Sequence, residues 1–286
     1  MPRKNKPTFP FPEDTDFISI PSDAIIHAVE SKSAPPIDSK NPMVRRLNSK
    51  TLVKSSRGML PSEASAMKLV AARTDIRVPE IYRFISREGE MSRFGTKGYL
   101  VMGHLPGQTL ATLWPGYNKV QKERAVAKIW DAVLKLREVK IGEPGPIGGG
   151  MAQGGLFTQY GAGPFPSAQT LEEWYSHKLE VCKRFKRVPN DAPSFEGRFE
   201  PPFCMTHQDL ALRNMLIDDE GELALVDWAF AGAYPPWFEI YAFGILDFNN
   251  PADYKKMMRE MMSREYEEET KHLRLVHYAL FTAPFA

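Results

Sequence analysis

Residues 203–230, FCMTHQDLALRNMLIDDEGELALVDWAF, place a few polar side chains at fixed intervals between apolar runs. Asp209 and Asn214 follow the first apolar run, and a loop that carries both can point their side chains into one cleft. The apolar segment Glu222–Val226 is typical of a strand, which then delivers Asp227 from the neighbouring hairpin. This spacing constrains the fold strongly, because it brings a loop and a hairpin to one place.

The residue types in this segment indicate a particular chemistry. His207-x-Asp209, then Asn214 and later Asp227, is the order of a phosphoryl-transfer catalytic loop followed by a metal-binding aspartate. One carboxylate must lie near the attacking hydroxyl, while an amide and a second carboxylate hold Mg²⁺ on the nucleotide phosphates. Asp-x-x-x-x-Asn alone is common. The same element followed thirteen residues later by a strand ending in Asp-Trp is far more specific.

The composition is ordinary for a soluble globular protein with room for two packed lobes. Of 286 residues, 43% are hydrophobic and 25% are charged. The 37 basic and 35 acidic residues give a net charge of +2, and no basic tract with interleaved aromatic residues occurs. We therefore expect no nucleic-acid partner.

The cysteine content and the N-terminus bear on the cellular compartment. Cys182 and Cys204 are too few and too far apart for a disulfide framework or a zinc site, so we expect two reduced thiols in a cytoplasmic protein. Residues 1–17 lack the apolar region that a signal peptide needs. No window approaches 18 consecutive apolar residues, so the sequence predicts no membrane-spanning segment and no membrane partner.

Turn signals and apolar periodicity divide the chain into a flexible tail at 1–17, a small strand-rich half at 18–103 and a larger helical half at 104–286. The first half is expected to hold a helix, a hairpin, a second helix and a buried strand, at 18–29, 43–55, 61–73 and 98–102. The second half is expected to hold a long Gly- and Pro-rich connection at 142–163 and helices at 117–139, 171–185 and 252–279. This order predicts a two-lobed α+β architecture with a hinge near 102–107.

Ordered blocks over most of the chain resemble the aminoglycoside-phosphotransferase-like family of small-molecule kinases, which is related to choline kinase. The sequence is most similar to the branch that is numerous in filamentous fungi. The resemblance runs from about Ile20 to Phe243 and rests on the blocks LVK at 52–54, SEASAMKLVA at 62–71, RVPEIY at 77–82, GYLVMGHLPGQTL at 98–110, GPF at 163–165, THQDLALRNMLID at 206–218 and VDWAFAGAYPPWFE at 226–239. It implies a protein-kinase-like fold, with a nucleotide-binding lobe at 18–103, a catalytic and substrate lobe at 104–286, and ATP between them.

The resemblance implies roles for individual residues. Lys54 matches the lysine that contacts the α- and β-phosphates, and Glu63 matches the glutamate that pairs with it. Taken singly, these residues would be a solvated strand lysine and a first-turn glutamate favoured by the helix dipole. The functional interpretation is favoured because both precede a complete catalytic loop. In that loop Asp209 matches the residue that accepts or orients the substrate hydroxyl, and Asn214 and Asp227 match the metal ligands.

Further expectations concern the hinge and the loop itself. The backbone from Met102 to His104 is expected to bind adenine through N–H and C=O groups. His207 is expected to be architectural, with its ring hydrogen-bonded to the backbone near the metal-binding aspartate. Arg213 either neutralises the catalytic aspartate, touches the γ-phosphate or pairs with a surface acid.

The sequence also departs from the family pattern. Residues 31–50, SKSAPPIDSKNPMVRRLNSK, contain no Gly-x-Gly-x-x-Gly, so the resemblance does not extend to a glycine loop over the phosphates. Gln208 stands where many relatives have glycine, and Gly103 stands where an acidic residue often follows the methionine. Trp228 and Ala229 replace the Phe-Gly of protein kinases, and no Ala-Pro-Glu follows, which argues against protein substrates.

These observations predict an ATP- and Mg²⁺-dependent kinase that phosphorylates a hydroxyl group of a small metabolite or natural product. The alternative is a kinase-fold protein without phosphotransfer activity, repurposed for metabolite binding or another biosynthetic reaction. The missing glycine loop motivates the alternative, and the filled positions Lys54, Glu63, Asp209, Asn214 and Asp227 argue against it. The expected partner is a small-molecule hydroxyl acceptor.

Overall fold

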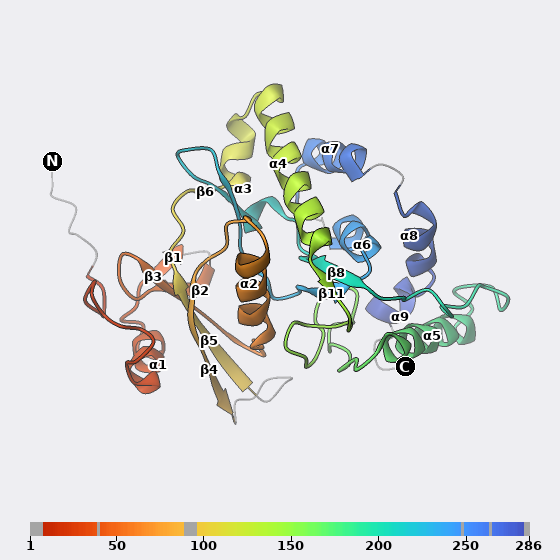
Figure 1. Ribbon diagram of the computed structural model, residues 1–286, viewed down its shortest axis with the longest axis horizontal. Helices are drawn as coiled ribbons and strands as arrows, with labels where there is room; N and C mark the ends of the chain where they lie inside the picture. The colour runs from red at the N-terminus through yellow and green to blue at the C-terminus, as the bar shows by residue number, and fades with distance from the viewer. Residues whose placement is uncertain (1–7, 39–40, 89–95, 247–248, 263–264, 283–286) are drawn as a thin grey trace.

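The chain folds into a strand-rich N-terminal part and a larger helical C-terminal part (Figure 1). The structure is a computed structural model that describes residues 8–38, 41–88, 96–246, 249–262 and 265–282. The two-lobed α+β fold that the sequence predicts is confirmed.

Five strands form one antiparallel sheet in the order β1-β2-β3-β5-β4. β2 and β3 form the predicted hairpin, and in its turn the Asn48 side chain accepts a hydrogen bond from the Lys50 N–H at 3.0 Å. The strands and the two helices of this part are β1 (Pro36–Asp38), β2 (Asn41–Arg46), β3 (Thr51–Arg57), β4 (Ile81–Glu88), β5 (Thr96–Gly103), α1 (Ser22–Glu30) and α2 (Ser62–Arg73).

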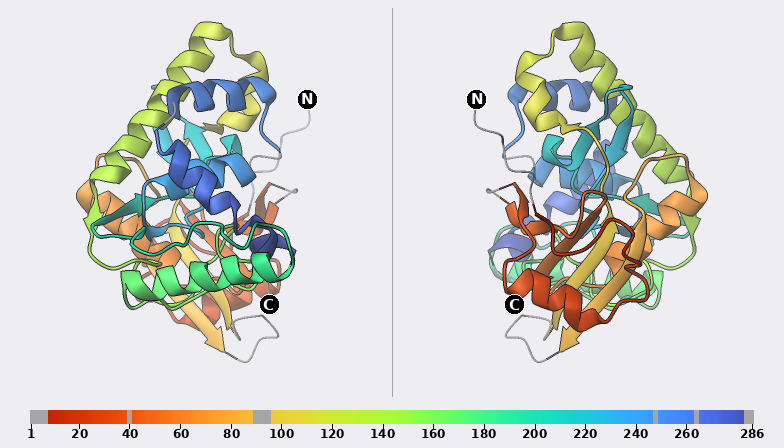
Figure 2. Two further views of the ribbon diagram at one scale, coloured as in Figure 1. Left: turned by 90° about the vertical axis from the view of Figure 1, so that its right-hand side faces the viewer. Right: turned by 90° about the vertical axis from the view of Figure 1, so that its left-hand side faces the viewer.

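Because side chains alternate along a strand, the sheet has two different faces. Val53 and Val101 belong to the hydrophobic cluster that includes α1. Leu52 and Leu100 belong to the main core, which includes α2. Figures 1 and 2 show the two helices on opposite sides of the sheet. Lys54, two residues after Leu52, therefore lies on the face that α2 covers.

The N-terminal segment differs from the expected flexible tail. Residues 8–17 are described, and Phe17 is buried with its ring centroid 5.5 Å from that of Phe11. The Phe11 N–H also donates to the Leu47 carbonyl at 3.2 Å. Apolar packing against the sheet orders this part of the chain, which lacks periodicity and so gave no signal in the sequence. Residues 1–7 lie outside the described residues.

The helices of the C-terminal part follow the apolar periodicity closely. The expected helices at 117–139 and 171–185 are confirmed within three residues at each end. The long helix α4 begins with a capping box in which Asn118 and Gln121 each bond the other's backbone. The helices are α3 (Leu110–Leu113), α4 (Lys119–Glu138), α5 (Ala168–Arg184), α6 (Trp237–Leu246), α7 (Ala252–Met262), α8 (Glu267–Arg274) and α9 (His277–Phe281).

Two helix expectations were inaccurate. The helix expected at 18–29 begins only at Ser22, after Pro21. The single helix expected at 252–279 is wrong, because α7, α8 and α9 are separate helices. Tyr266 has a φ of +59°, a left-handed backbone conformation that interrupts the helix just before α8.

Two small sheets carry the polar segment from which the sequence argument began. The first has the order β10-β9-β6 and the second the order β11-β8-β7. β8 ends directly before His207, and the β9–β10 hairpin leads to Asp227. Their bounds are β6 (Gln108–Thr109), β7 (Lys140–Ile141), β8 (Phe203–Thr206), β9 (Met215–Ile217), β10 (Leu223–Leu225) and β11 (Gly232–Tyr234).

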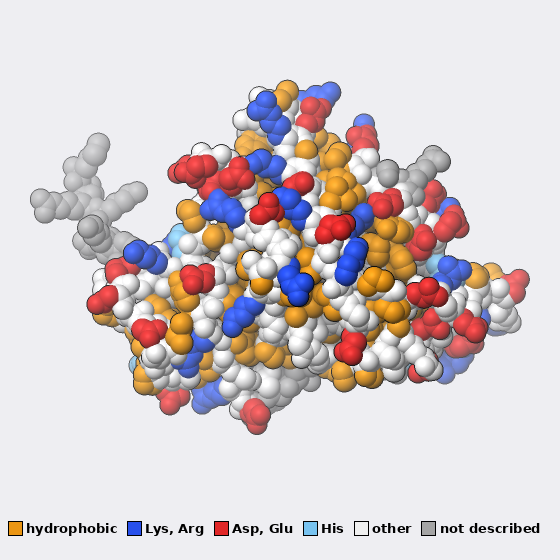
Figure 3. All heavy atoms as spheres, viewed as in Figure 1, with side chains coloured by type: hydrophobic (Ala, Val, Ile, Leu, Met, Phe, Trp, Pro, Cys, Tyr) orange, Lys and Arg blue, Asp and Glu red, His pale blue; other side chains and the backbone are white. Residues whose placement is uncertain are grey.

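Two further observations concern the surface and the helices. On the face in Figure 3, both basic and acidic side chains occur from one end of the molecule to the other. Within the described residues, no helix has the length and apolarity needed to cross a membrane.

Candidate active site

Three charged residues from distant parts of the chain meet between the two parts of the molecule. Lys54 lies on β3, Glu63 lies in the first turn of α2, and Asp227 follows β10. The Lys54 Nζ atom is 2.7 Å from Glu63 Oε1 and 2.6 Å from Asp227 Oδ1. The Glu63 side chain is 3% exposed, whereas that of Asp227 is 41% exposed. The structure thus brings together three of the residues that the sequence singled out.

The electrostatics of this cluster follow from burial and mutual attraction. Burial alone would lower the pKa of Lys54, but the carboxylates of Glu63 and Asp227 outweigh it and raise this pKa. Desolvation would raise the pKa of Asp227, but the Lys54 ammonium outweighs it and lowers this pKa. At Glu63 burial prevails over the attraction of Lys54 and raises the pKa. Of the two carboxylates, Asp227 is therefore the one that more firmly keeps its negative charge.

The loop after β8 holds the remaining predicted residues. A short 3-10 helix, Leu212–Asn214, turns the chain so that the Asn214 Nδ2 group donates to the Asp209 carbonyl at 3.1 Å. The Val226 N–H donates to the Asn214 carbonyl at 3.0 Å, which ties the loop to the strand before Asp227. These bonds leave the Asn214 Oδ1 oxygen as the atom that could contact a metal ion.

Arg213 forms an ion pair with the carboxylate of Asp209. The Asp209 side chain is largely buried, whereas the Arg213 side chain is 52% exposed. Of the roles considered for Arg213, the structure shows the neutralisation of Asp209. An acceptor hydroxyl that approaches Asp209 would have to share this carboxylate with the guanidinium group.

His207 has the architectural contact that the sequence predicted. Its Nδ1 atom accepts the Asp209 N–H at 3.2 Å, so its Nε2 atom carries the proton and donates to the Val226 carbonyl at 3.2 Å. Burial lowers the pKa of His207, which keeps the ring neutral. The ring thereby joins the catalytic loop to the strand that precedes Asp227.

Glu239 is a site residue that the sequence argument missed. It lies in the first turn of α6, and its two carboxylate oxygens accept the backbone N–H groups of His207 at 2.6 Å and Gln208 at 2.9 Å. Burial raises the pKa of Glu239 to about 7. The signal that could have identified it is a single acidic residue within the otherwise apolar segment WFEIYAFGIL.

The backbone just before Asp209 is in an unusual conformation. Gln208 has a φ of +64° and Asp227 has a φ of +67°, values that residues other than glycine rarely adopt. The two hydrogen bonds to Glu239 hold the backbone at Gln208 in this conformation, at a position where many relatives have glycine. Conformations of this kind collect at functional sites because surrounding contacts maintain them.

The hinge residues expected to bind adenine already use two of their donors. The Gly103 N–H donates to the Glu80 carbonyl at 2.8 Å, and the His104 N–H donates to the Lys50 carbonyl at 2.7 Å. The His104 ring lies 3.3 Å from the Arg46 guanidinium, and burial together with Arg46 lowers the pKa of His104. The expectation that the backbone of Met102–His104 binds adenine therefore needs revision for the Gly103 and His104 amides.

The donor set suits Mg²⁺ more than a metal held by protein alone. Within the described residues, no group of three or more His, Cys, Asp or Glu side chains could hold a metal ion. A magnesium ion bound to a nucleotide needs fewer protein ligands, because phosphate oxygens and water complete its coordination. One amide oxygen from Asn214 and one carboxylate from Asp227 fit this requirement.

Comparisons with known proteins bear on the fold and the family. No curated protein sequence matches the chain. The solved structures that match include aminoglycoside phosphotransferase APH(2'')-Ib with ADP bound, at 10% identity and a TM-score of 0.53 over 93% of each chain. Another is the gentamicin complex of APH(2'')-IIa, at 10% identity and a TM-score of 0.51 over 88% of this chain and 84% of that one. At this identity they show a shared fold. The family model described as "Phosphotransferase enzyme family" matches residues 37–275. The chain therefore belongs to the phosphotransferase enzyme family.

Proposed function

We propose that this protein transfers the γ-phosphoryl group of ATP to a hydroxyl group of a small metabolite or natural product. The observation that carries this proposal is the cluster in which Lys54 lies 2.6 Å from Asp227, next to the loop that holds Asp209 and Asn214. Membership of a phosphotransferase family and the ADP-bound state of the APH(2'')-Ib structure support it. Within the family, the sequence blocks favour the branch that is numerous in filamentous fungi, and a cytoplasmic location fits two free cysteines.

Each residue of the site has a role that follows from its chemistry. Asn214 and Asp227 would hold Mg²⁺, which neutralises phosphate charge when it is bound with ATP. Lys54 then leaves Asp227 for the α- and β-phosphates, while Glu63 keeps its ammonium group in place. Asp209 orients the acceptor hydroxyl and takes its proton. Positioning and charge neutralisation supply most of the rate enhancement in such a site.

Adenine would lie at the boundary between a nucleotide-binding lobe at 18–103 and a catalytic and substrate lobe at 104–286. The amides of Gly103 and His104 are engaged, so the next amide along the chain, that of Leu105, is the donor that we assign to adenine. The carbonyls from Met102 to His104 would accept from the adenine amino group. Arg46 and His104 would flank the base.

Calorimetry with Mg·ATP tests the proposal directly. Wild type should bind Mg·ATP, and EDTA should weaken this binding strongly because Asp227 and Asn214 contact the nucleotide through the metal. A thermal shift should follow, with a gain of about 2.7 kcal/mol at a ligand concentration one hundred times the dissociation constant. Metabolite mixtures incubated with Mg·ATP should then yield products heavier by one phosphoryl group. Absence of both binding and thermal shift at millimolar Mg·ATP would remove the basis of the proposal.

Two observations favour a second function. Residues 31–50 contain no glycine, and the His104 amide is engaged by Lys50, so part of the usual nucleotide surface is missing. A kinase-fold protein that binds a metabolite without phosphotransfer would share these features. Such a protein would bind small molecules equally well with and without Mg·ATP and would form no phosphorylated product.

A further inference from the structure

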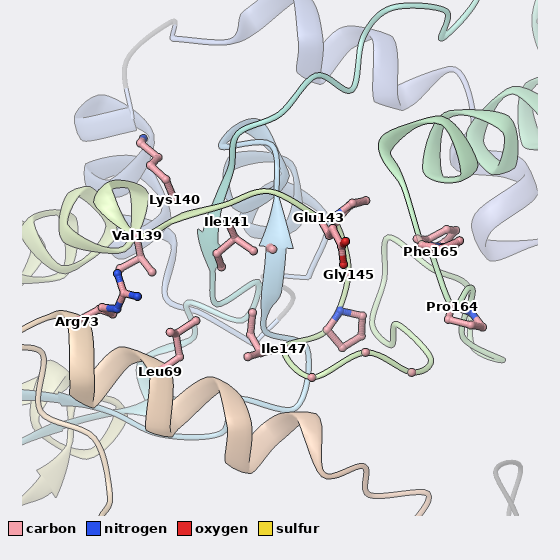
Figure 4. A pocket seen from close by; sticks show the side chains of 17 residues that line it. Leu69, Arg73, Val139, Lys140, Ile141, Glu143, Gly145, Ile147, Pro164 and Phe165 are labelled. Carbon is pink, nitrogen blue, oxygen red and sulfur yellow. The ribbon is translucent and has the colours of Figure 1, made fainter.

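A cavity of about 530 Å³ lies between α2 and the chain that follows α4 (Figure 4). Leu69 and Arg73 of α2 line one side of it, and Ile141 and Ile147 line it from the chain that follows α4. Phe165 lies toward the end of the hollow that is farther from Arg73 in this view. The cavity is thus an elongated apolar space with a basic side chain at one end.

The segment 142–155, here called the glycine strap, forms the second wall. Gly145 pairs with Ala233 of β11 through two backbone hydrogen bonds of 3.0 and 2.8 Å. Gly148 lies so close to α2 that a Cβ atom on it would be 3.3 Å from Ser65 Oγ. The strap has φ values of +86°, +83° and +95° at Gly148, Gly149 and Gly150, which side-chain-bearing residues rarely adopt. The wall therefore follows a defined path along α2.

The charges that line the cavity are few and asymmetric. Within the described parts of the chain, the Arg73 guanidinium has neither a hydrogen-bond partner nor an ion-pair partner. Lys140 lies toward the same end, and its ammonium group donates to the Arg137 carbonyl at 2.5 Å. Glu143, on the strap, is the acidic residue of the lining. A carboxylate or phosphate at the Arg73 end could form an ion pair with this guanidinium, which now faces solvent.

The cavity is separate from the site described above. None of its 17 lining residues belongs to the catalytic loop at 206–214 or to the segment 226–229. The cavity nevertheless touches α2 and the glycine strap, two elements that also contact the active-site region. α2 carries Glu63 six residues before Leu69.

The glycine strap also leads from the cavity to the active site. Beyond the cavity, the Gln153 side chain donates to the Gly58 carbonyl at 2.9 Å, in the turn between Lys54 and Glu63. Gly154 lies against Phe230, three residues after Asp227, and a Cβ atom on it would be 3.0 Å from that ring. An occupant of the cavity would therefore contact α2 and the strap at once.

We propose that this cavity binds a small amphipathic anion, with its acidic group at Arg73 and its apolar body toward Phe165, and that the bound anion favours nucleotide binding. The cavity exists in the conformation in which Lys54 and Glu63 are paired. A ligand that fits it selects this conformation, because a ligand shifts an equilibrium toward the state that it binds better. The effect on nucleotide affinity rests on the proposed function, whereas binding of the anion does not.

Calorimetry with 2-naphthoate and its neutral analogue 2-naphthamide tests the binding. Wild type should bind the anion at least about tenfold more tightly than the amide, and Arg73→Gln should remove this difference while leaving amide binding unchanged. Arg124→Gln, at an exposed arginine of α4 outside the cavity, should bind both like wild type. Leu69→Trp should abolish both by filling the space. Equal affinity of wild type for the two probes, or no loss in Arg73→Gln, would overturn an anion site and would leave a neutral ligand or a protein segment as the occupant.

The coupling is tested by titrating Mg·ATP with and without saturating 2-naphthoate. The anion should tighten Mg·ATP binding about fivefold in wild type and should have no effect in Arg73→Gln at the same concentration. If 2-naphthoate binds but leaves the Mg·ATP affinity unchanged, the effector role is wrong. If Mg·ATP does not bind at all, the proposed function fails as well, while the naphthoate titration still decides whether the anion site exists.

Discussion

The Lys54 ammonium nitrogen lies 2.7 Å from a carboxylate oxygen of Glu63, across the turn that joins β3 to α2. Both side chains are nearly buried, at 12% and 3% exposed. The contact holds α2 against the sheet and fixes the ammonium group that also reaches Asp227. The pair therefore links the stability of the N-terminal part to the geometry of the site.

Lys54→Met should destabilise the protein by about 3 kcal/mol, because removal of one partner leaves a buried carboxylate at Glu63 without compensation. The exposed pair of Lys119 and Glu123 provides the matched control, since Lys119 is 88% exposed and its substitution should cost less than about 0.5 kcal/mol. Urea unfolding at neutral pH measures both changes. The double variant Lys54→Met/Glu63→Gln should regain part of the loss, and a double variant no more stable than Lys54→Met would contradict this explanation.

Asp209→Asn and Asp227→Ala should separate catalysis from nucleotide binding. The proposed function assigns Asp209 to the acceptor hydroxyl, so Asp209→Asn should lower turnover by about 10²–10⁴-fold and leave Mg·ATP affinity nearly unchanged. Asp227→Ala should weaken Mg·ATP itself, because it removes the carboxylate assigned to the metal. Calorimetry of the two variants checks the binding difference before any acceptor is known. Equal Mg·ATP affinity for wild type and Asp227→Ala would show that Asp227 is not a metal ligand.

Glu239 should make the stability depend on pH. Its pKa rises from 4.5 in the unfolded chain to about 7 in the folded protein, so the folded state binds the proton more tightly. This contribution is fully present below pH 4.5 and is lost as the pH rises through about 7, with a total of roughly 3 kcal/mol from the pKa difference.

Glu239→Gln removes the titration. The stability of wild type relative to this variant should therefore fall between about pH 4.5 and 7, as measured by urea unfolding across this range. A constant difference over these pH values would mean that Glu239 has an ordinary pKa. Because both carboxylate oxygens accept N–H groups from the catalytic loop, the variant should also lose turnover at every pH.

Gly232→Ala should detach the glycine strap from β11. A Cβ atom at Gly232 would lie 2.6 Å from the Gly145 carbonyl oxygen, which belongs to backbone and has no free rotation to avoid it. We expect a loss of about 1–3 kcal/mol in the free energy of unfolding. Gly116→Ala is the matched control, because nothing lies within 4 Å of a Cβ atom there. Thermal unfolding of the two variants distinguishes local crowding from a general effect of alanine, and equal melting temperatures would count against the contact.

The sequence by itself determined many of the elements and several of the residues that meet at the site. Local signals sufficed for the β2–β3 hairpin, for α4, and for the loop that holds His207, Asp209 and Asn214. Each depends on residues close together in the chain, where turn chemistry and apolar periodicity act directly. The contact of Lys54 with Glu63 could also be expected, because Lys54 lies on a strand and Glu63 lies nine residues later, in the first turn of the next helix.

Only the tertiary structure decided the contacts between distant segments. The sequence did not show that Glu239 accepts hydrogen bonds from the His207 and Gln208 amides. This contact depends on how α6 packs against a loop more than thirty residues earlier in the chain. The engaged His104 amide depends on the partner that the fold places opposite it. The break in the expected helix at 252–279 likewise reflects packing, since helical periodicity continues across Tyr266 although its backbone is left-handed. Local sequence determines which backbone conformations are low in free energy. Burial of groups far apart in the chain then decides which of these conformations the folded protein adopts.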